Sequence, residues 1–452
     1  MKVDCLVAEI GSTTTVVNAF TGLTAGIPRF VAQGAAATSV LDGDVNIGLM
    51  AALRDAERSL GEAIAYDEMF ASSSAAGGLR MTVHGLVYDM TVKAAKEAAL
   101  GSGAVMVDVT AGRLSPYDVE RIRDLAPNMI LLAGGVDYGE KQTALANFMA
   151  LLPLLSAIPL VYAGNIENQR TLDRLAVEHG VEVRFADNVY PSIDTLHVEP
   201  TRRLIQELFE KHIVHAPGMA RIRDLVNGPI MPTPGAVMAA AELARELFGD
   251  VVVFDVGGAT TDVHSVTEGD AEIARLATSP EPFAKRTVEG DLGVYVNRLH
   301  VYREYEAAFA DIPDARQRIA ALTPLPQTAE ERKLVSRLTK VCVEMALQRH
   351  AGRLVERYTP SGRLITAVGR DLTAVRTIIG TGGPLTRLAA SDTLWQGLRK
   401  RSGDVQLYPP EDARILIDHD YIMASLGVLA ARYPEAAKTL LLASVTREQR
   451  EV

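Results

Sequence analysis

The feature that most constrains the fold of this chain is a short polar pattern that occurs twice, far apart in the sequence. Each copy runs from an apolar stretch through an acidic residue and a glycine to a set of hydroxyl side chains, and then into a second apolar stretch. The first copy spans residues 5–20 and the second spans residues 251–266. Two apolar runs joined by a glycine-led turn are typical of a β-hairpin. The repeat therefore predicts two lobes of related topology, each built around one hairpin.

The second copy carries the more specific pattern. A strand is expected at residues 251–254, and it ends in Asp255. The turn that follows holds two glycines and two threonines: Gly257, Gly258, Thr260 and Thr261. Glycine lets the backbone turn with positive φ and lets a phosphate approach the N–H groups closely, and threonine adds hydroxyl donors. Asp255 is placed where a carboxylate can hold the water shell of Mg²⁺. An ordinary hairpin turn is the less favoured alternative.

The first copy repeats this chemistry in a weaker form. Glu9 takes the place of the aspartate, and one glycine and three hydroxyl residues follow: Gly11, Ser12, Thr13 and Thr14. Alone, this turn could be purely structural. Together, the two turns predict a clamp around the phosphates of ATP, in which Mg²⁺ and backbone donors stabilise charge on the leaving oxygens. We therefore predict Glu9 and Asp255 as catalytic and metal-binding residues, with ATP and Mg²⁺ as cofactors.

A third glycine cluster follows the two hairpins in the chain. A strand is expected at residues 377–379, and the cluster begins directly after it with Gly380, Gly382 and Gly383. Glycines leave room for a flat ring and a ribose against the backbone. The cluster is a weak signal alone, but its position after both hairpins predicts a nucleotide contact.

The chain between the hairpins predicts a separate subdomain. Apolar strands alternate with helical segments from residue 105 to residue 185, which is typical of a doubly wound parallel sheet. The 452 residues, 48% of them hydrophobic, are also too many for one ordinary domain. We predict an α/β protein with four parts. These are a first lobe (1–102), an inserted Rossmann-like subdomain (103–188), a helical segment with a connecting helix (189–248), and a second lobe with a helical insertion (249–452).

Composition narrows the partners and the compartment. The formal net charge of −10 repels phosphate backbones, so nucleic acid is not expected as a partner. Two cysteines, Cys5 and Cys342, cannot form a Cys-only zinc site and indicate a reducing compartment. No signal peptide is expected at the N-terminus, and prolines interrupt the longest apolar stretch, residues 148–163. We expect a cytoplasmic protein without a membrane span.

The two hairpins and the glycine cluster, in this order, resemble the ATPase superfamily of actin, sugar kinases and heat-shock chaperones. The resemblance implies two ribonuclease-H-like lobes with the nucleotide bound in the cleft. Residues 232–244 and 420–431 resemble the two connecting helices of that superfamily, where small residues let the helices cross closely at a hinge.

A narrower resemblance covers essentially the whole chain. Several segments are similar to the MutL-type family of glutamate mutase (methylaspartate mutase) accessory proteins: residues 9–15, 33–40, 72–79, 131–137, 286–293 and 379–384. The resemblance implies an ATP-dependent reactivating chaperone that releases damaged cobalamin from an adenosylcobalamin-dependent mutase. The subunits of that mutase would be its partners.

The sequence departs from the wider superfamily at two places. Glu9 stands where many members have aspartate, and residues 232–235 contain no acidic or amide side chain to orient an attacking water. The second departure predicts slow hydrolysis. Glu289, predicted as catalytic, and Asp291 are candidate replacements, with a capped helix start before Leu292 as the alternative reading of this pair.

Three other functions stay open. A small-molecule kinase would need a base near the second turn, for which Asp262 could be proposed. An activator of radical dehydratases would need a Cys-ligated iron–sulfur cluster, which Cys5 in a strand and Cys342 in a helix disfavour. A non-hydrolysing assembly factor would bind ATP as a structural ligand. The turns after the inserted strands, Gly134-Gly135 and Gly164-Asn165, are read first as simple strand–helix turns, with a small-molecule site or a partner surface as the alternative. The insertion is the candidate for mutase contact.

Overall fold

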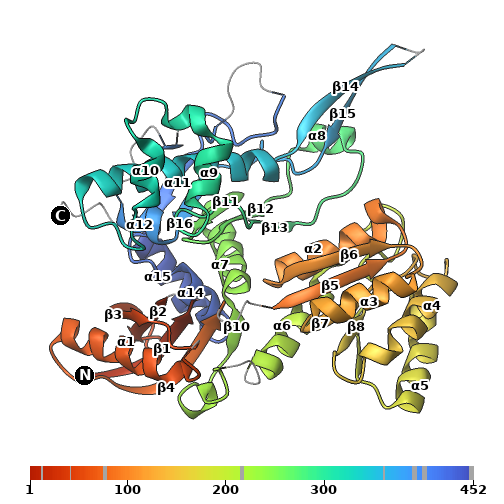
Figure 1. Cartoon of the computed structure of the whole chain (residues 1–452), viewed down its shortest axis with the longest axis horizontal. Helices are drawn as coiled ribbons and strands as arrows, with labels where there is room; N and C mark the ends of the chain where they lie inside the picture. Colours follow the sequence, from red (N-terminus) through yellow and green to blue (C-terminus); the bar gives the residue numbers. More distant parts are fainter. Residues whose placement is uncertain are drawn as a thin grey trace. The chain divides into compact units, whose positions relative to one another are not determined.

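The computed structural model comprises two compact units (Figure 1). One unit comprises Met1–Ala236 with Ala431–Tyr433, and the other comprises Val237–Ala430 with Pro434–Val452. The structure describes residues 1–11, 14–40, 42–74, 79–213, 218–359, 362–388, 394–395, 397–399 and 405–446, without the side chains of residues 212 and 359.

The first unit contains a five-stranded mixed sheet in the order β10-β4-β1-β2-β3. Its strands are β1 (Lys2–Ile10), β2 (Thr14–Thr21), β3 (Arg29–Ala37), β4 (Ala65–Ser73) and β10 (Ile230–Pro232). Strand β2 is antiparallel to β1 and β3, whereas β4 is parallel to both β1 and β10. This is the arrangement of a ribonuclease-H-like lobe.

Helix α1 (Val45–Leu60) covers the hairpin side of this sheet, in contact with β2 and β3. It begins at Asp44, whose side chain accepts the Asn46 N–H, and it ends at Gly61, whose φ of +83° suits glycine. Leu49 and Leu53 bury the apolar face that the sequence spacing predicts.

The second unit repeats the same sheet. The order is β13-β12-β11-β16-β17, made of β11 (Val251–Val256), β12 (Thr261–Val266), β13 (Ala284–Glu289), β16 (Thr377–Thr381) and β17 (Arg414–Ile417). The central hairpin is again antiparallel, and β16 and β17 are again parallel to β11. The prediction of two lobes with related topology, each built on one of the two hairpins, is confirmed.

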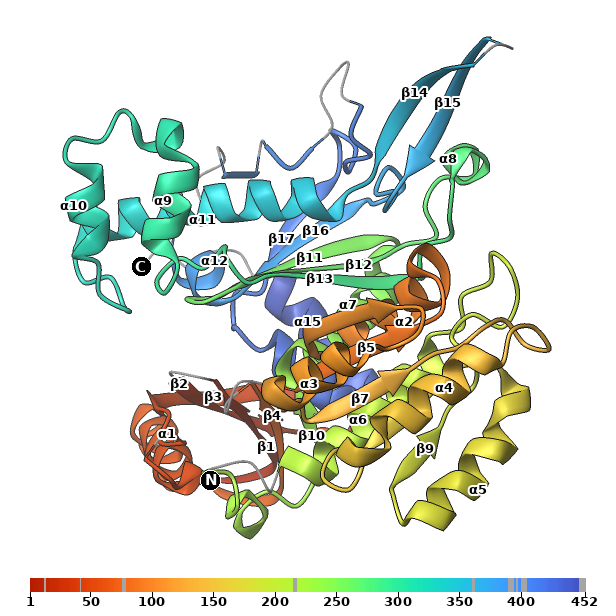
Figure 2. The same ribbon diagram turned by 45° about the vertical axis from the view of Figure 1, so that its right-hand side comes forward.

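Helix α11 (Ala329–His350) lies against β11, β12 and β13 of this sheet (Figure 2). A capping box formed by Thr328 and Glu331 begins the helix. Leu338 and Leu347 then join Phe254 of β11 in one buried apolar cluster. The hairpin of the second unit is therefore supported by a packed core rather than by a loose turn.

The remaining elements of the second unit surround this core. They are the last part of α7 (Thr233–Phe248), α8 (Ala271–Leu276), α9 (Arg298–Glu304), η6 (Glu306–Phe309), α10 (Ala315–Ala320), the two-stranded ribbon β14 (Arg353–Thr359) and β15 (Gly362–Val368), α12 (Gly383–Arg387), α14 (Met423–Ala430) and α15 (Pro434–Thr446).

A second sheet of the first unit is entirely parallel, as the alternating pattern predicts. Its order is β6-β5-β7-β8-β9, made of β5 (Arg80–Gly85), β6 (Val105–Ala111), β7 (Met129–Leu132), β8 (Leu160–Tyr162) and β9 (Val183–Phe185). The other helices of the first unit are η2 (Tyr88–Val92), α2 (Lys93–Gly101), α3 (Pro116–Leu125), α4 (Gln142–Leu151), η3 (Leu152–Leu154), η4 (Ile166–Asn168), α5 (Gln169–His179), α6 (Glu199–Ile213) and η5 (Ile222–Asp224).

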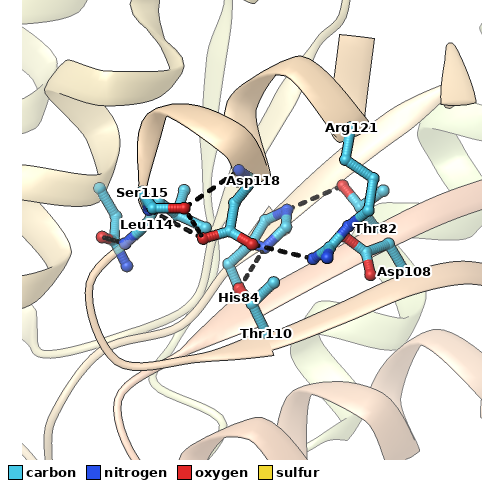
Figure 3. A network of polar contacts seen from close by, with 9 residues as sticks. Thr82, His84, Asp108, Thr110, Leu114, Ser115, Asp118 and Arg121 are labelled. Carbon is cyan, nitrogen blue, oxygen red and sulfur yellow. Dashed lines mark hydrogen bonds and ion pairs between the residues drawn. The ribbon is translucent and has the colours of Figure 1, made fainter. Parts of the chain in front are cut away.

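The parallel sheet begins with β5, before residue 103, where the sequence analysis placed the start of this subdomain. Strand β5 was missed because polar residues alternate with apolar ones in a strand that is buried on both faces. Figure 3 shows how the polar residues are satisfied: the His84 ring contacts the Thr110 hydroxyl at 2.7 Å and the Thr82 hydroxyl at 2.9 Å. Burial lowers the pKa of His84 to about 4, so the ring is neutral in this strand.

Among the described residues, no helix combines the length and the apolar character that crossing a membrane requires.

Candidate functional site

The two hairpin turns are closed by the same hydrogen bond. The Gly11 N–H donates to the Thr14 carbonyl at 2.9 Å, and the Gly257 N–H donates to the Thr260 carbonyl at 2.9 Å. The first turn is also braced by the Thr38 hydroxyl, which donates to the Gly11 carbonyl at 2.8 Å. The sequence repeat is therefore a structural repeat. Ser12 and Thr13, predicted to bind the cofactor, lie outside the described residues.

Three carbonyl groups of the second turn accept hydrogen bonds from one segment, residues 294–297, which we call the brace. The Gly257 carbonyl accepts the Val294 N–H at 3.3 Å, and the Gly258 carbonyl accepts the Tyr295 N–H at 2.9 Å. The Ala259 carbonyl accepts the side-chain amide of Asn297 at 2.7 Å. In a trans peptide the N–H points opposite to the carbonyl. The N–H groups of residues 258–260 therefore point away from this brace, which gives the turn a set of backbone donors suited to an anion.

The brace depends on a close approach that only glycine permits. A Cβ atom on Gly293 would lie 2.3 Å from the Ala259 carbonyl carbon, far inside contact distance. Next to it, the buried Thr261 hydroxyl donates to the Leu292 carbonyl at 2.6 Å. In the structure Thr261 therefore holds the brace, and its predicted contact with a nucleotide stays a prediction. Gly293 and Asn297 were missed as supports because only tertiary contacts reveal their role.

The structure brings Asp255 together with part of the third glycine cluster. Gly382 has a φ of +88°, and a Cβ atom there would lie 2.2 Å from the Val256 carbonyl oxygen and 2.8 Å from Asp255 Oδ1. A Cβ atom on Gly383 would instead meet open space. Gly380 differs, because its missing side chain makes room for the buried Trp395 ring, 2.7 Å from the ideal Cβ position. Gly380 thus serves the core in this structure.

Asp255 lies in a strongly acidic environment. Burial, together with the nearby carboxylates of Asp262 and Asp418, raises the pKa of Asp255 to about 7, although Arg286 opposes this shift. Asp262 itself is bound by Arg286, whose Nε and Nη2 donate to Oδ1 at 3.0 and 2.7 Å. Arg286 thus binds Asp262 directly, whereas no ion pair to Asp255 is found among the described residues.

This environment fits a hydrated magnesium ion beside Asp255. The described residues contain no group of three or more His, Cys, Asp or Glu side chains that could enclose a metal. Mg²⁺ does not need one, since it usually keeps several waters and binds through one or two carboxylates together with substrate phosphates. A dication near Asp255 would also offset the carboxylate repulsion that raises its pKa. The carboxylate of Asp255 is therefore chemically suited to hold the water shell of a magnesium ion.

Glu9 occupies the equivalent position in the first unit. Each acid is the second-last residue of the first hairpin strand, Glu9 in β1 and Asp255 in β11. Glu9 is only 8% exposed, and its Oε1 accepts the side-chain amide of Asn18 at 3.4 Å. Gln33 in turn donates to Asn18 at 2.8 Å. The glutamate is thus held by a chain of amides across β2 and β3, a support that the sequence analysis did not identify.

Glu289 and Asp291 are both bound by Arg349 on α11. Arg349 Nη1 donates to Glu289 Oε2 and to Asp291 Oδ1, both at 2.7 Å, and Nη2 donates to Asp291 Oδ2 at 2.9 Å. Burial raises the pKa of Glu289, whereas the hydrogen bond from Arg349 lowers the pKa of Asp291. This clamp fixes the chain just before Gly293 to α11. The catalytic role of Glu289 stays a prediction.

Asp418 caps the helical segment that follows β17. Its fully buried Oδ2 accepts the N–H groups of Ile422 and Met423 and the Thr381 hydroxyl, at 2.9 to 3.0 Å, and its Oδ1 accepts the Ser444 hydroxyl at 2.6 Å. The cap therefore fixes α14 to the end of β16, the strand that carries the third glycine cluster.

Comparison with known proteins gives a consistent match along the whole chain. The family model described as "MutL protein" matches residues 5–445. Protein MutL of Clostridium tetanomorphum is 35% identical over 422 residues, which cover 89% of this chain and 91% of that protein. Among solved structures, the chain is similar to nucleotide-free acetone carboxylase (14% identity, TM-score 0.42, 95% of this chain and 70% of that one). It is also similar to nucleotide-free diol dehydratase-reactivating factor (11% identity, TM-score 0.39, 96% of this chain and 100% of that one).

Proposed function

This chain belongs to the MutL protein family, and on that premise we propose that it is an ATP-dependent reactivating chaperone for an adenosylcobalamin-dependent mutase of the glutamate mutase type. Nucleotide binding and slow hydrolysis would be coupled to the release of damaged cobalamin from the mutase subunits. The observation that carries the proposal is the repeated hairpin turn, closed in both units by the same glycine-to-threonine bond and preceded in both by an acid.

The second turn supplies the groups that a nucleotide phosphate needs. Its backbone N–H groups at residues 258–260 would donate to phosphate oxygens, and the Cβ position of Gly383, which follows Gly382 in the chain, meets open space. Mg²⁺, when bound, neutralises charge on the phosphates. Asp255 would hold the water shell of that ion, and Glu9 would act correspondingly at the first turn. We propose that each of the two turns binds nucleotide phosphate.

Slow hydrolysis agrees with the surroundings of the predicted water-orienting groups. Residues 232–235 carry no acidic or amide side chain, and the Thr233 hydroxyl lies 3.3 Å from the Ser72 hydroxyl. Glu289 and Asp291 are occupied by Arg349. A general base must be free to accept a proton from water. These contacts favour a slow nucleotide switch, and they also keep a non-hydrolysing assembly factor as the second candidate.

Two other functions are less well supported. A sugar-kinase-like role for Asp262 as a base conflicts with its buried ion pair to Arg286, which keeps the carboxylate engaged. An iron–sulfur activator needs cysteine thiolates as ligands. Burial raises the pKa of the Cys342 thiol to about 12 and raises that of Cys5 as well, so both thiols stay protonated.

The decisive experiment measures reactivation of a mutase that has lost activity with its cobalamin still bound. The purified chain, ATP and Mg²⁺ are added with fresh adenosylcobalamin, and both mutase activity and released cobalamin are followed. The proposal expects recovery that requires ATP and Mg²⁺ and that fails with Asp255→Asn. Equal recovery with a non-hydrolysable ATP analogue would favour the assembly factor. A phosphorylated metabolite formed without mutase would favour the kinase and contradict the proposal.

A further inference from the structure

The loops at the carboxyl edge of the parallel sheet form one connected surface. Asp137, after β7, is the centre: its Oδ1 accepts the Ile166 N–H and the side-chain amide of Asn188, both at 2.9 Å, and its N–H donates to the Pro191 carbonyl at 2.9 Å. The loops after β7, β8 and β9 (residues 133–141, 163–168 and 186–195) are therefore fixed to one another. We call these three loops the edge platform.

The edge platform displays large apolar side chains to solvent, one from each loop. Tyr138 is 78% exposed, Ile193 is 71% exposed and Ile166 is 48% exposed. Isolated exposed apolar residues are common on protein surfaces, but a rigid group of them, including an aromatic ring, is typical of a binding surface.

Tyr138 is also held in an unfavourable backbone conformation. Its φ is +61°, a region that bulky residues rarely adopt, and the side chain of Asn165 fixes it by accepting the Tyr138 N–H at 3.2 Å. Such strain persists where surrounding structure enforces it and often marks a functional position. Here the enforced conformation belongs to the most exposed aromatic residue of the platform.

The platform leaves no room for a small ligand between the loops after β7 and β8. Open parallel sheets bind ligands where the strand order reverses, which in this sheet lies between β5 and β7 and not between these two loops. At this edge a Cβ atom on Gly164 would lie 2.4 Å from the Gly134 nitrogen, so the loops after β7 and β8 touch through their backbones. The side chain of Asn165 also donates to the carbonyls of Gly139 and Glu140 at 3.3 Å. The platform therefore fits a protein surface better than a small molecule.

The charge of the edge platform indicates the chemistry of its partner. The three loops carry five carboxylates and one lysine, a net formal charge of −4: Asp137, Glu140, Lys141, Glu167, Asp187 and Asp194. Lys141 is paired with Glu167 at 2.7 Å. A second copy of the chain would place like charge against like charge in a symmetric interface, which is unfavourable. A partner with an apolar centre and a basic rim is favoured.

We propose that the edge platform is the docking surface for the client, a subunit of the cobalamin-dependent mutase that presents an apolar patch surrounded by basic residues. This inference rests on the proposed function and adds the surface through which the chaperone recognises its substrate. Ile193 and Ile166 provide apolar contact, Tyr138 provides an aromatic anchor, and the carboxylates select a basic rim.

The test uses the full chain with a photoreactive benzoylphenylalanine at position 193, or at position 177 as the control. Val177 is 76% exposed on α5 of the same subdomain, so it matches Ile193 in exposure but lies outside the platform. With purified mutase subunits and ATP, the proposal expects at least a tenfold higher yield of a cross-link to a mutase subunit from position 193. A cross-link to a second copy of the chain, or equal yields from both positions, would overturn it.

A double substitution tests the docking surface independently of the proposed function. Ile166→Ser with Ile193→Ser is expected to weaken binding of mutase subunits at least tenfold, while Val177→Ser changes it less than twofold and all variants keep the same ATP affinity. Equal subunit binding by the double variant and Val177→Ser would reject the docking surface, even if the unmodified chain reactivates the mutase. Cross-linking and weakened binding without any reactivation would support the surface and reject the proposed function.

Discussion

Asp255 and Asp262 face each other across the second hairpin, yet their surroundings differ. Asp262 has Arg286 as a buried partner, whereas Asp255 meets mainly burial and negative charge. A bound cation would therefore stabilise the charged form of Asp255, whereas the protein itself stabilises the charged form of Asp262. Removing the charge of Asp255 should therefore leave the fold as stable or more stable, whereas removing the charge of Asp262 should destabilise it.

Replacing Asp255 by asparagine should greatly slow turnover without harming the fold. We expect Mg²⁺-dependent ATP hydrolysis to fall on the order of 100-fold, a typical loss when one charge-stabilising group of a site is removed. The free energy of unfolding at pH 8 should stay equal or rise, because an unfavourable buried charge disappears. Hydrolysis rates and urea denaturation measure both. Unchanged turnover would contradict the prediction that Asp255 helps to hold the magnesium ion.

The pKa of Asp255 predicts a pH dependence of stability. Its pKa is about 7 in the folded chain and 3.8 ordinarily, so folding favours the protonated form. The stabilising contribution is complete below pH 4 and is lost as the pH rises through 7, at no more than about 1.4 kcal/mol per pH unit. The advantage of Asp255→Asn over the unmodified chain should therefore grow from pH 5 to pH 8 in urea denaturation. A constant difference across this range would contradict the assigned pKa.

Replacing Asp262 should instead destabilise the second unit. Asp262→Asn leaves the buried guanidinium of Arg286 without its carboxylate, which costs about 3–5 kcal/mol in comparable pairs. The double variant Asp262→Asn with Arg286→Met should recover much of that loss, because no unpaired charge remains. Thermal and urea unfolding measure this. A double variant that is less stable than the single one would show that Arg286 has further roles.

At the scale of elements, the turn between β16 and α12 depends on Gly382. Gly382→Ala adds a Cβ atom 2.2 Å from the Val256 carbonyl oxygen in a backbone with φ of +88°. Gly249→Ala is the matched control, since Gly249 has φ of +75° and open space around it. The control should lose about 1–2 kcal/mol of stability from backbone strain alone. Gly382→Ala should lose more and should also weaken ATP affinity, as measured by calorimetry; equal losses would show that the contact relaxes.

The elements also show what could be predicted from the sequence. Both hairpins were predicted correctly, because glycine-led turns between apolar runs are local signals. Strand β5 was missed, because Thr82 and His84 look unsuited to a buried strand until Thr110 on β6 is placed beside them. The support from Gly293 and the clamp by Arg349 were missed for the same reason: both depend on segments that meet only in the folded chain.

At the scale of the whole molecule, each unit carries one copy of the same sheet and the same turn. If both turns contribute to ATP binding, Thr14→Val and Thr260→Val should each weaken ATP affinity in calorimetry, by about tenfold for the loss of a hydrogen bond to a charged group. Thr439→Val on α15 serves as the control. An effect from only one hairpin would contradict the proposal that both turns bind nucleotide.

The place of β5 decides how the inserted subdomain can be removed. β5 is hydrogen-bonded to β6 on one side and to β7 on the other, although it precedes both in the chain. Deleting residues 103–188 would leave β5 with two bare edges, and unpaired strand edges favour aggregation. Loss of partner binding in such a truncated chain would then report misfolding. A clean deletion has to remove β5 through β9 together, because the hydrogen-bonded unit starts at β5.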